Sequence, residues 1–269
     1  MQLEFRKLRE ENWKSFEEIE EGSFPKDILS KDDFIKFTEN EGFVGAFFDN
    51  ELVGYLLLRT LGSYGHLNRI AVHPHKRRQG FGSKFMEFTL NYFGKRGCTK
   101  VGLYVETDNT GAIDLYRLFG FEISKEAWHY WISEDEIKKI LEATSVSDRI
   151  SLRELGLQHY NTIIMAFPEI NKDETREHLS NKNRHLILGL FDGDELVIYA
   201  RYNKDFGGAR PFLCKNEAYF DKFVFHLMKH SPKRNYFRVT FENNRKLAKM
   251  LEKRGYKLHH HLWYMTREL

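Results

Sequence analysis

The feature that most constrains the fold is an internal repeat. Three stretches from the first half of the chain recur in the second half in the same order, each at a predicted strand or turn. The matched pairs are 3–8 with 150–155, 48–53 with 191–197, and 109–121 with 244–256, after which Trp128 falls on Trp263. One such match could arise by chance, but three in the same order argue for duplication. The sequence therefore predicts two copies of one fold within 269 residues, a length that gives each copy room for its own core.

The first copy alternates between strand-like and helix-like patterns. Apolar residues recur at every second position in the expected strands and at helical spacing in the expected helices. The expected strands are 3–8, 43–48, 52–59, 67–72, 100–106 and 121–131, and the expected helices are 11–20, 31–40, 81–93 and 109–120. Hairpins come early and crossovers late, so each copy is predicted to be an α/β domain with a mixed, mostly antiparallel sheet flanked by helices. A charged helix over 134–144 precedes a polar stretch, and we place the boundary there, between domains 1–144 and 145–269.

Composition limits the classes of partner. The formal net charge is only +3, which does not favour a dedicated nucleic-acid binder. The charged N-terminus lacks the apolar run of a signal peptide, and no stretch has the length to span a membrane, so we expect a cytoplasmic protein. Cys98 and Cys214 are far apart without metal-ligand spacing and are expected to be idle thiols. The consecutive histidines 259–261 lie in an alternating stretch and point to opposite faces of a strand, so no metal site is predicted.

A basic, glycine-containing loop stands between a predicted strand and a predicted helix. The apolar run over 67–72 is ended by Pro74, which cannot donate to a sheet, and the helix that follows carries Phe81 and Phe85 on one face. The loop 77–82 holds two glycines that let the backbone approach a ligand, and the first amides of the helix have no acceptor inside it. These features predict an anion site for a phosphate-bearing ligand. A solvated basic turn, a nucleic-acid patch or a localisation signal would carry the same residues.

Two motifs in the first copy resemble those of the GNAT acetyltransferase superfamily. The loop motif Arg/Gln-x-x-Gly-x-Gly/Ala is matched at Arg77, Gly80 and Gly82. The later motif Asn-x-x-Ala-x-x-Leu-Tyr-x-x-x-Gly-Phe is matched over 109–121. The resemblance implies two tandem GNAT-like domains, of which the first uses acetyl-CoA as co-substrate. The residues that it implies for acetyl-CoA binding are Ile70, Ala71, Val72, Arg77, Arg78, Gln79, Gly80, Phe81, Gly82, Ser83 and Asn109.

The same resemblance assigns roles within this set. The amides of 78–83 would hold the pyrophosphate, the open backbone of 70–72 would hold the pantetheine and the acetyl carbonyl, and Asn109 would contact the pantetheine arm. Tyr116 would lie beside the thioester sulfur as the catalytic residue. A thiol of pKa about 8.5 departs more readily when a hydroxyl of pKa about 10 donates to it, which supports that role. The alternative for Tyr116 is a core aromatic on the inner face of its helix.

The second copy lacks both features at the matching places. Leu251 stands where the first copy has its tyrosine, and the stretch 205–217 has no basic pair before its glycines. Gly207 and Gly208 could be read as a vestigial phosphate loop, but Pro211 follows too soon to begin the same helix. We therefore expect no CoA site in this half, and a role in shaping the first site or in forming an oligomer contact.

The expected function is transfer of acetyl from acetyl-CoA to a primary amine of a small molecule or peptide. The attack is expected to be direct, since neither cysteine lies near the motifs. Glu20, Glu21 and His66 are candidates for the general base. The stretch 22–25 resembles the substrate loop of RimI-type N-terminal acetyltransferases, although Tyr104 stands where those enzymes carry a glutamate. The alternatives are a RimI-like protein N-terminal acetyltransferase and a non-catalytic module that binds acyl-CoA or nucleic acid.

Overall fold

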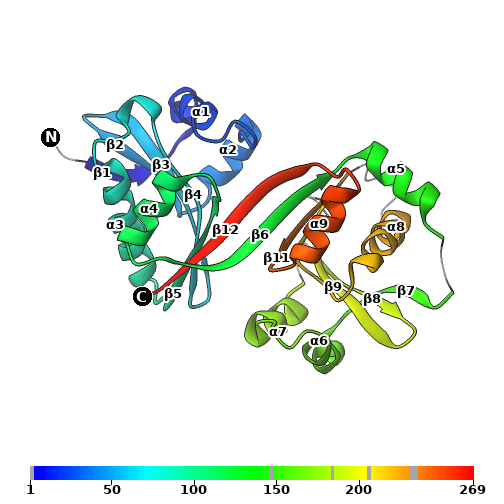
Figure 1. The fold of residues 1–269 in the computed structure, drawn as a ribbon. Helices are drawn as coiled ribbons and strands as arrows, with labels where there is room; N and C mark the ends of the chain where they lie inside the picture. The colour runs from blue at the N-terminus through cyan, green and yellow to red at the C-terminus, as the bar shows by residue number, and fades with distance from the viewer. Residues whose placement is uncertain (1–2, 146–147, 183–184, 205–206, 231–235) are drawn as a thin grey trace. The chain divides into compact units, whose positions relative to one another are not determined.

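The computed structural model describes residues 3–145, 148–182, 185–204, 207–230 and 236–269. The chain forms two compact units, of which the first comprises Met1–Ser124 with Trp263–Leu269 and the second comprises Lys125–Leu262. Each unit is an α/β structure in which helices flank the strands (Figure 1). No helix in the described part of the chain has the length and apolarity needed to cross a bilayer.

The sheet of the first unit is antiparallel except at one pair of strands. Its strands are β1 (Leu3–Lys7), β2 (Phe43–Phe48), β3 (Glu51–Leu61), β4 (Tyr64–Val72) and β5 (Lys100–Glu106), followed by the end of β12 (Leu258–Glu268). Its helices are α1 (Trp13–Glu21), α2 (Lys31–Thr38), α3 (Phe81–Gly94) and α4 (Thr110–Leu118). Neighbours from β1 to β4 are antiparallel, whereas β4 and β5 are parallel because the crossover through α3 joins them.

Two apolar clusters cover the two faces of this sheet. Phe16 of α1 and Phe34 of α2 are fully buried with Phe43 and Leu57 on one face. On the other face, side chains of α3 and α4 pack over alternate residues of β4 and β5. This cluster includes Phe85 of α3, Ile113 of α4, Leu67 of β4 and Val101 of β5. Because successive side chains of a strand point to opposite faces, each strand contributes apolar residues to both clusters. A one-residue shift in strand pairing would send these residues to the wrong face, so burial on both faces fixes the register of the sheet.

The strands β4 and β5 separate partway along their length. Their pairing runs only from Tyr64 with Lys100 to Leu67 with Leu103. At the same place, the register between β3 and β4 shifts so that Asn68 forms a bulge. The edge of β4 that follows the bulge does not pair with β5, and the chain runs from this edge through a short loop into α3.

The second unit repeats the element order of the first. Its strands run in the order β6 (Glu122–Ile132), β11 (Phe237–Glu242), β10 (Gly208–Cys214), β9 (Glu195–Asn203), β8 (His185–Asp192) and β7 (Ile150–Glu154). Its helices are α5 (Glu134–Ala143), α6 (Tyr160–Ala166), α7 (Lys172–Ser180), α8 (Phe220–His230) and α9 (Arg245–Lys253). The predicted tandem α/β fold is therefore confirmed.

Matching caps explain the shared Asn…Gly motif. Asn109 accepts a hydrogen bond from the Ala112 amide at the start of α4, and Asn244 does the same for the Leu247 amide at the start of α9. Each helix is followed by a glycine with positive φ, +76° at Gly120 and +80° at Gly255, a conformation that favours glycine at a helix end. The Asn and the Gly of the motif thus have a structural role in both repeats.

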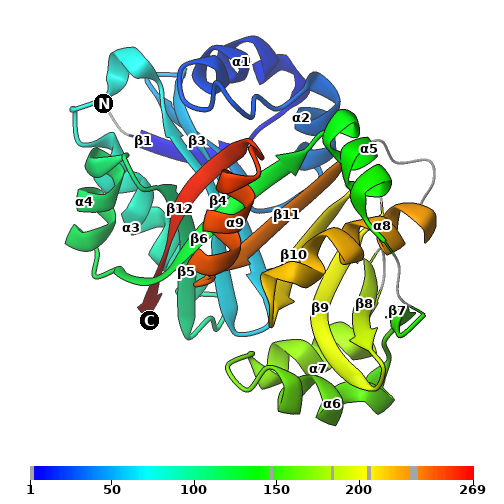
Figure 2. The same ribbon diagram turned by 45° about the vertical axis from the view of Figure 1, so that its right-hand side comes forward.

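The two repeats exchange their last strands. β6 ends the first repeat, yet it pairs antiparallel with β11 in the second unit from Ala127 to Ile132 (Figure 2). β12 ends the second repeat, and its residues from Trp263 onward belong to the first unit. The compact units consequently differ from the ranges 1–144 and 145–269, because β6 and α5 pack into the second core through residues such as Ile137.

Candidate active site

A run of unpaired amides follows the open edge of β4. The chain leaves Val72, forms a single 3-10 turn over Pro74–Lys76, and enters α3 at Phe81. Arg78 and Gly80 both have positive φ, +62° and +83°, which turns the backbone sharply before the helix. Within the described part of the chain, the six amides from 78 to 83 donate no hydrogen bond. A curved row of outward amides at a helix start is a site for an anion.

The two motif glycines serve different purposes. A Cβ at Gly80 would meet no atom within 4 Å, so crowding does not require glycine at this position. The positive φ is what favours glycine here, and the space in front of the loop is open. A Cβ at Gly82 would lie 3.1 Å from Cδ2 of Leu115 on α4. Gly82 therefore keeps α3 close to α4, and a larger residue there would act through helix packing as well as through the loop.

The Arg77 side chain is turned away from the run of amides. Its guanidinium donates to the carbonyls of Val72 and Gly22 at 3.1 and 2.8 Å and to the hydroxyl of Ser23 at 3.0 Å. Arg77 therefore fixes the loop against the end of α1. Arg78 is exposed and pairs with no carboxylate in the described residues, and its position in the loop puts its charge beside the amides.

The predicted residues of β4 present an open backbone edge. Ile70, Ala71 and Val72 pair with β3 on one side only, because β5 has already separated. Ala71 is buried, while Ile70 and Val72 are half-buried against the α3 side. The edge leads directly to the six amides, so one elongated ligand could contact both.

Tyr116 lies on the inner face of α4. Its side chain is 5% exposed and packs beside Phe121, with the ring centroids 6.1 Å apart. Its hydroxyl makes no hydrogen bond within the described residues, and burial raises its pKa above the ordinary value of about 10. The hydroxyl therefore stays protonated at neutral pH and is able to donate. Asn109, at the start of the same helix, uses its side-chain oxygen for the cap.

Glu20, one of the predicted bases, is instead a structural residue. Its carboxylate is fully buried and accepts hydrogen bonds from Arg69 at 2.7 and 2.9 Å, from the Leu29 amide at 2.8 Å, and from the Tyr55 hydroxyl. Burial and the neighbouring Glu20 charge raise the pKa of Tyr55. A carboxylate that accepts four hydrogen bonds from three donor groups and has no solvent contact is not placed to receive a proton from a substrate, so this prediction is wrong.

The segment between α1 and α2 is held over the face of the sheet that these two helices cover. The Arg69 guanidinium donates to the Asp27 carbonyl at 2.7 Å and lies 4.3 Å from the Phe24 ring. Lys26 reaches Glu106 at the end of β5, at 3.5 Å. Contacts to β4 and to β5 therefore fix this segment beside the gap between the two strands.

Titratable side chains on β4 and β5 point to the face of the sheet that α1 and α2 cover. His66 is half-buried, with Nδ1 3.2 Å from the Tyr64 hydroxyl, and its ring lies beside Tyr104. Glu106 is half-buried and follows Tyr104 by two residues, so strand alternation places both on one face. Sequence analysis missed Glu106, although this alternation was the signal for it. Glu21 is exposed and lines a separate open pocket beside His73 and His75.

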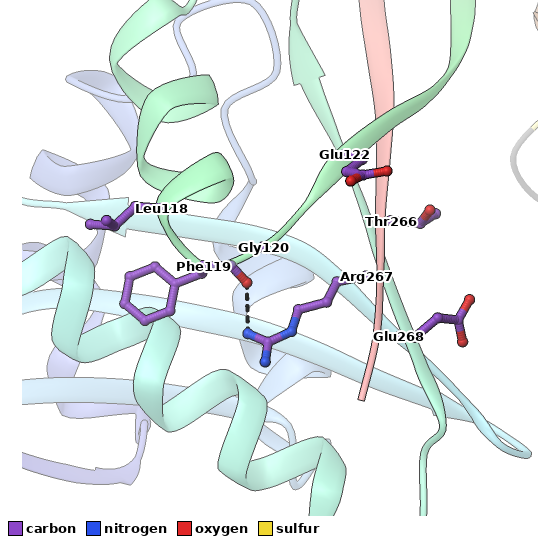
Figure 3. A pocket seen from close by; sticks show the side chains of 7 residues that line it. All are labelled: Leu118, Phe119, Gly120, Glu122, Thr266, Arg267 and Glu268. Carbon is purple, nitrogen blue, oxygen red and sulfur yellow. Dashed lines mark hydrogen bonds between the residues drawn. The ribbon is translucent and has the colours of Figure 1, made fainter.

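Another pocket lies at the far end of α4. Its lining residues are Leu118, Phe119, Gly120, Glu122, Thr266, Arg267 and Glu268. Figure 3 shows the Arg267 guanidinium directed at the Phe119 carbonyl, to which it donates at 2.6 Å. The arginine therefore satisfies a carbonyl at the helix end, and none of the predicted site residues lines this pocket.

In the second unit, the described passage from β10 to α8 has no equivalent of the amide loop. Between β10 and α8 lie only Lys215, Asn216 and one 3-10 turn, and Asn216 caps that turn through the Ala218 amide. Acidic Glu217 and Asp221 stand at the start of α8, where an anion would be repelled. Gly207 and Gly208 lie at the entry to β10 and not at the start of a helix.

Comparisons with known proteins agree with this architecture. Residues 5–121 match the model of the acetyltransferase (GNAT) family. Mycothiol acetyltransferase from Clavibacter sepedonicus is 36% identical over 73 residues, covering 27% of this chain and 24% of that protein. N-alpha-acetyltransferase 30 from Saccharomyces cerevisiae is 30% identical over 90 residues, covering 33% of this chain and 51% of that protein. The matched part thus spans between a quarter and a half of these relatives.

Two solved structures share the whole fold. A GCN5-related N-acetyltransferase from Sphaerobacter thermophilus superimposes with a TM-score of 0.67 at 14% identity, over 99% of this chain and 95% of that one. A tandem GNAT protein from the clavulanic acid biosynthesis pathway superimposes with a TM-score of 0.61 at 14% identity, over 99% and 98%. At these identities the likeness concerns the fold, and the family match rests on residues 5–121. By that match, residues 5–121, the first repeat of this chain, belong to the GNAT acetyltransferase family.

Proposed function

We propose that the chain is an N-acetyltransferase whose first unit moves acetyl from acetyl-CoA to a primary amine. The observation that carries the proposal is the run of six unpaired amides over 78–83, placed directly after the open edge of β4. A pyrophosphate presents oxygens at the spacing of consecutive amides, and the helix start adds partial positive charge. The names of the relatives, a mycothiol acetyltransferase and an N-alpha-acetyltransferase, support the same class of reaction.

Each part of the site has a distinct task in this proposal. The amides of 78–83 and the Arg78 charge bind the pyrophosphate, and the edge 70–72 binds the amide-bearing arm and orients the acetyl carbonyl. Arg77 keeps the loop in shape through Val72 and Gly22. The thioester of acetyl-CoA supplies the activated acetyl group.

Tyr116 is the proposed acid. The amine nitrogen forms a bond to the acetyl carbon, the carbon–sulfur bond breaks, and the electron pair leaves on sulfur. The protonated Tyr116 hydroxyl donates to that sulfur, and the proton lost by the amine restores the balance through solvent. Burial keeps the hydroxyl protonated, because it raises the pKa of Tyr116. His66 and Glu106, on the face beside the α1–α2 segment, are the proposed acceptors of the amine's proton.

The direct test is release of free thiol from acetyl-CoA in the presence of amines. Polyamines, amino acids, aminoglycosides and peptides with free N-termini form the panel, each with and without protein. The proposal expects thiol release that depends on one class of amine and saturates with both substrates. Saturable acetyl-CoA binding without turnover on any amine would favour a non-catalytic binder. Steeply salt-dependent binding of DNA or RNA would favour a nucleic-acid module.

A protein N-terminus is a second candidate acceptor. The yeast relative, named as an N-alpha-acetyltransferase, matches 90 residues of this chain at 30% identity. An α-amino group has a pKa near 8 and needs less help to lose its proton than a lysine side chain. Preference for peptide N-termini over polyamines in the same screen would establish this candidate.

A further inference from the structure

An imidazole and two tyrosine hydroxyls meet over strand β5 of the first unit. The Tyr64 hydroxyl lies 2.7 Å from the Tyr264 hydroxyl and 3.2 Å from Nδ1 of His66. All three side chains are half-buried. The Tyr104 ring packs against both ends of the group, with its centroid 4.8 Å from the Tyr264 ring and 6.0 Å from the His66 ring. The polar groups therefore form a connected chain in the order His66, Tyr64, Tyr264.

Gly102 of β5 makes the approach of the two hydroxyls possible. The residue is buried, and a Cβ there would overlap the Tyr64 hydroxyl and lie 2.7 Å from the Tyr264 hydroxyl. Its φ is not positive, so the two hydroxyls, and not the backbone conformation, require glycine at this position. The strand is thus shaped to admit the contact between Tyr64 and Tyr264.

Tyr264 reaches this group from the second repeat. β12 closes that repeat, yet its residues from Trp263 onward belong to the first unit. Trp263 and Met265 pack in the apolar cluster of α3 and α4, so strand alternation turns Tyr264 to the face that α1 and α2 cover. Leu67 of β4 packs in the same apolar cluster, which places His66 on that opposite face too. The second repeat therefore supplies a side chain that meets a candidate base of the first unit through one intermediate.

The two distances indicate which atoms donate. A hydroxyl donor lies at most about 3.0 Å from its acceptor oxygen, whereas an N–H donor reaches about 3.2 Å. The contact of 2.7 Å fits a hydroxyl donor, and the contact of 3.2 Å fits Nδ1–H of His66 donating to the Tyr64 oxygen. Tyr64 then donates its own proton to the Tyr264 oxygen. In this arrangement the neutral His66 ring carries its proton on Nδ1, and Nε2 keeps a lone pair.

We propose that Tyr264 is a positioning residue that acts on His66 through Tyr64. By accepting the Tyr64 proton, it keeps the Tyr64 oxygen available to Nδ1–H and so holds the tautomer whose Nε2 accepts a proton. Without that acceptor, the Tyr64 hydroxyl turns to donate to Nδ1, and the ring proton moves to Nε2. This inference rests on the proposed function, in which His66 receives the proton of the amine.

The proton balance follows from this arrangement. As the amine nitrogen forms its bond to the acetyl carbon, one N–H bond breaks and its proton passes to Nε2 of His66. The imidazolium keeps its Nδ1–H bond to Tyr64 and afterwards returns the extra proton to solvent. The departing sulfur takes its proton from Tyr116. Glu106, the other proposed acceptor, already faces the Lys26 ammonium at 3.5 Å, so the inference assigns the amine proton to His66.

The test reads the tautomer of His66 directly. The full chain is labelled with nitrogen-15 in its histidines, and the His66 ring signals are identified by their loss in His66→Gln. At about pH 8, where an imidazole is ordinarily neutral, wild type should carry the proton on Nδ1. Tyr264→Phe keeps the ring that packs against Tyr104 and should move the proton to Nε2. Tyr92→Phe removes a hydroxyl of α3 and should leave the proton on Nδ1.

Turnover of the amine found by the thiol-release screen is the second readout. Tyr264→Phe should lower kcat by about tenfold or more, as a part of the ~10²–10⁴-fold that a positioned base contributes. The KM for acetyl-CoA should not change, because the tautomer of His66 affects the reaction and not the binding of the cofactor. Tyr64→Phe removes the acceptor of Nδ1–H, and this second variant should show the same shift and the same loss.

The two readouts separate this inference from the proposed function. A proton on Nε2 in wild type, or on Nδ1 in folded Tyr264→Phe, would overturn the inference whether or not the protein turns over an amine. Wild-type kcat in Tyr264→Phe would also overturn it. Absence of thiol release from wild type with every amine would instead contradict the proposed function, and the spectra would still decide whether Tyr264 sets the tautomer of His66.

Discussion

Tyr116→Phe separates the chemical role of this tyrosine from its packing role. The substitution keeps the ring that packs beside Phe121 and removes only the hydroxyl. In the described residues that hydroxyl makes no hydrogen bond, so its removal leaves no donor or acceptor unpaired. Deleting such a hydroxyl should change the free energy of unfolding by less than about 1 kcal/mol.

The expected effect on turnover is much larger. A positioned acid contributes about 10²–10⁴-fold to a rate, which corresponds to about 3–5 kcal/mol in the activation free energy. The loss should appear in kcat with acetyl-CoA affinity nearly unchanged, because the hydroxyl acts on the departing sulfur. Since burial raises the pKa of Tyr116 above 10, loss of activity in wild type between pH 7 and 9 should not come from its ionisation.

The assay is thiol release at saturating acetyl-CoA, paired with urea unfolding of the same preparations. Tyr92→Phe is the matched control, because it removes a hydroxyl from a half-buried tyrosine on α3 of the same unit. Tyr92→Phe should retain wild-type kcat. If Tyr116→Phe also retains wild-type kcat, the acid role is refuted and the departing thiolate takes its proton from water.

Two further predictions concern buried charge. Glu20→Leu leaves Arg69, whose side chain is 16% exposed, without its carboxylate, and should lower the free energy of unfolding by about 3–5 kcal/mol in urea titration; a loss below 1 kcal/mol would contradict the structural role. Burial lowers the pKa of His178 to about 4, which is about 2.5 below the ordinary value of 6.5. Folding therefore favours the neutral imidazole, and about 3 kcal/mol of the free energy of unfolding is lost as pH falls from 6.5 to 4. His178→Phe should remove that part of the acid-side loss, and identical pH profiles of unfolding for the two proteins would contradict it.

The local elements of the fold were predictable, whereas the strand exchange was not. Alternation over 121–131 indicates a strand, but it does not say which strand is its neighbour, and β6 pairs with β11 through residues more than a hundred positions away. The predicted boundary at 144 followed a change in composition. The structural boundary follows pairing and packing, which place α5 in the second core through Ile137 and Ile140.

The site likewise combines features that follow from local sequence with features that depend on distant contacts. The amide loop follows from local rules, since a glycine-containing turn before a helix leaves its first amides unpaired. The roles of Arg77 and Glu20 depend on partners distant in sequence, namely the Gly22 carbonyl and the Arg69 guanidinium, and periodicity carries no signal for them. Leu251 stands at the repeat position that corresponds to Tyr116, and this difference indicated from the sequence alone that the two halves differ.

Calorimetric titration with acetyl-CoA tests the central claim, that the first unit alone holds the cofactor. Gly80→Val places a branched residue at φ +83° in the loop, and Gly62→Val imposes a similar strain of about 1–2 kcal/mol at φ +59° in an open turn of the same unit. We predict one acetyl-CoA per chain for wild type and Gly62→Val, and no measurable binding for Gly80→Val with its fold retained by circular dichroism. Two acetyl-CoA per chain, or wild-type affinity in folded Gly80→Val, would contradict the account.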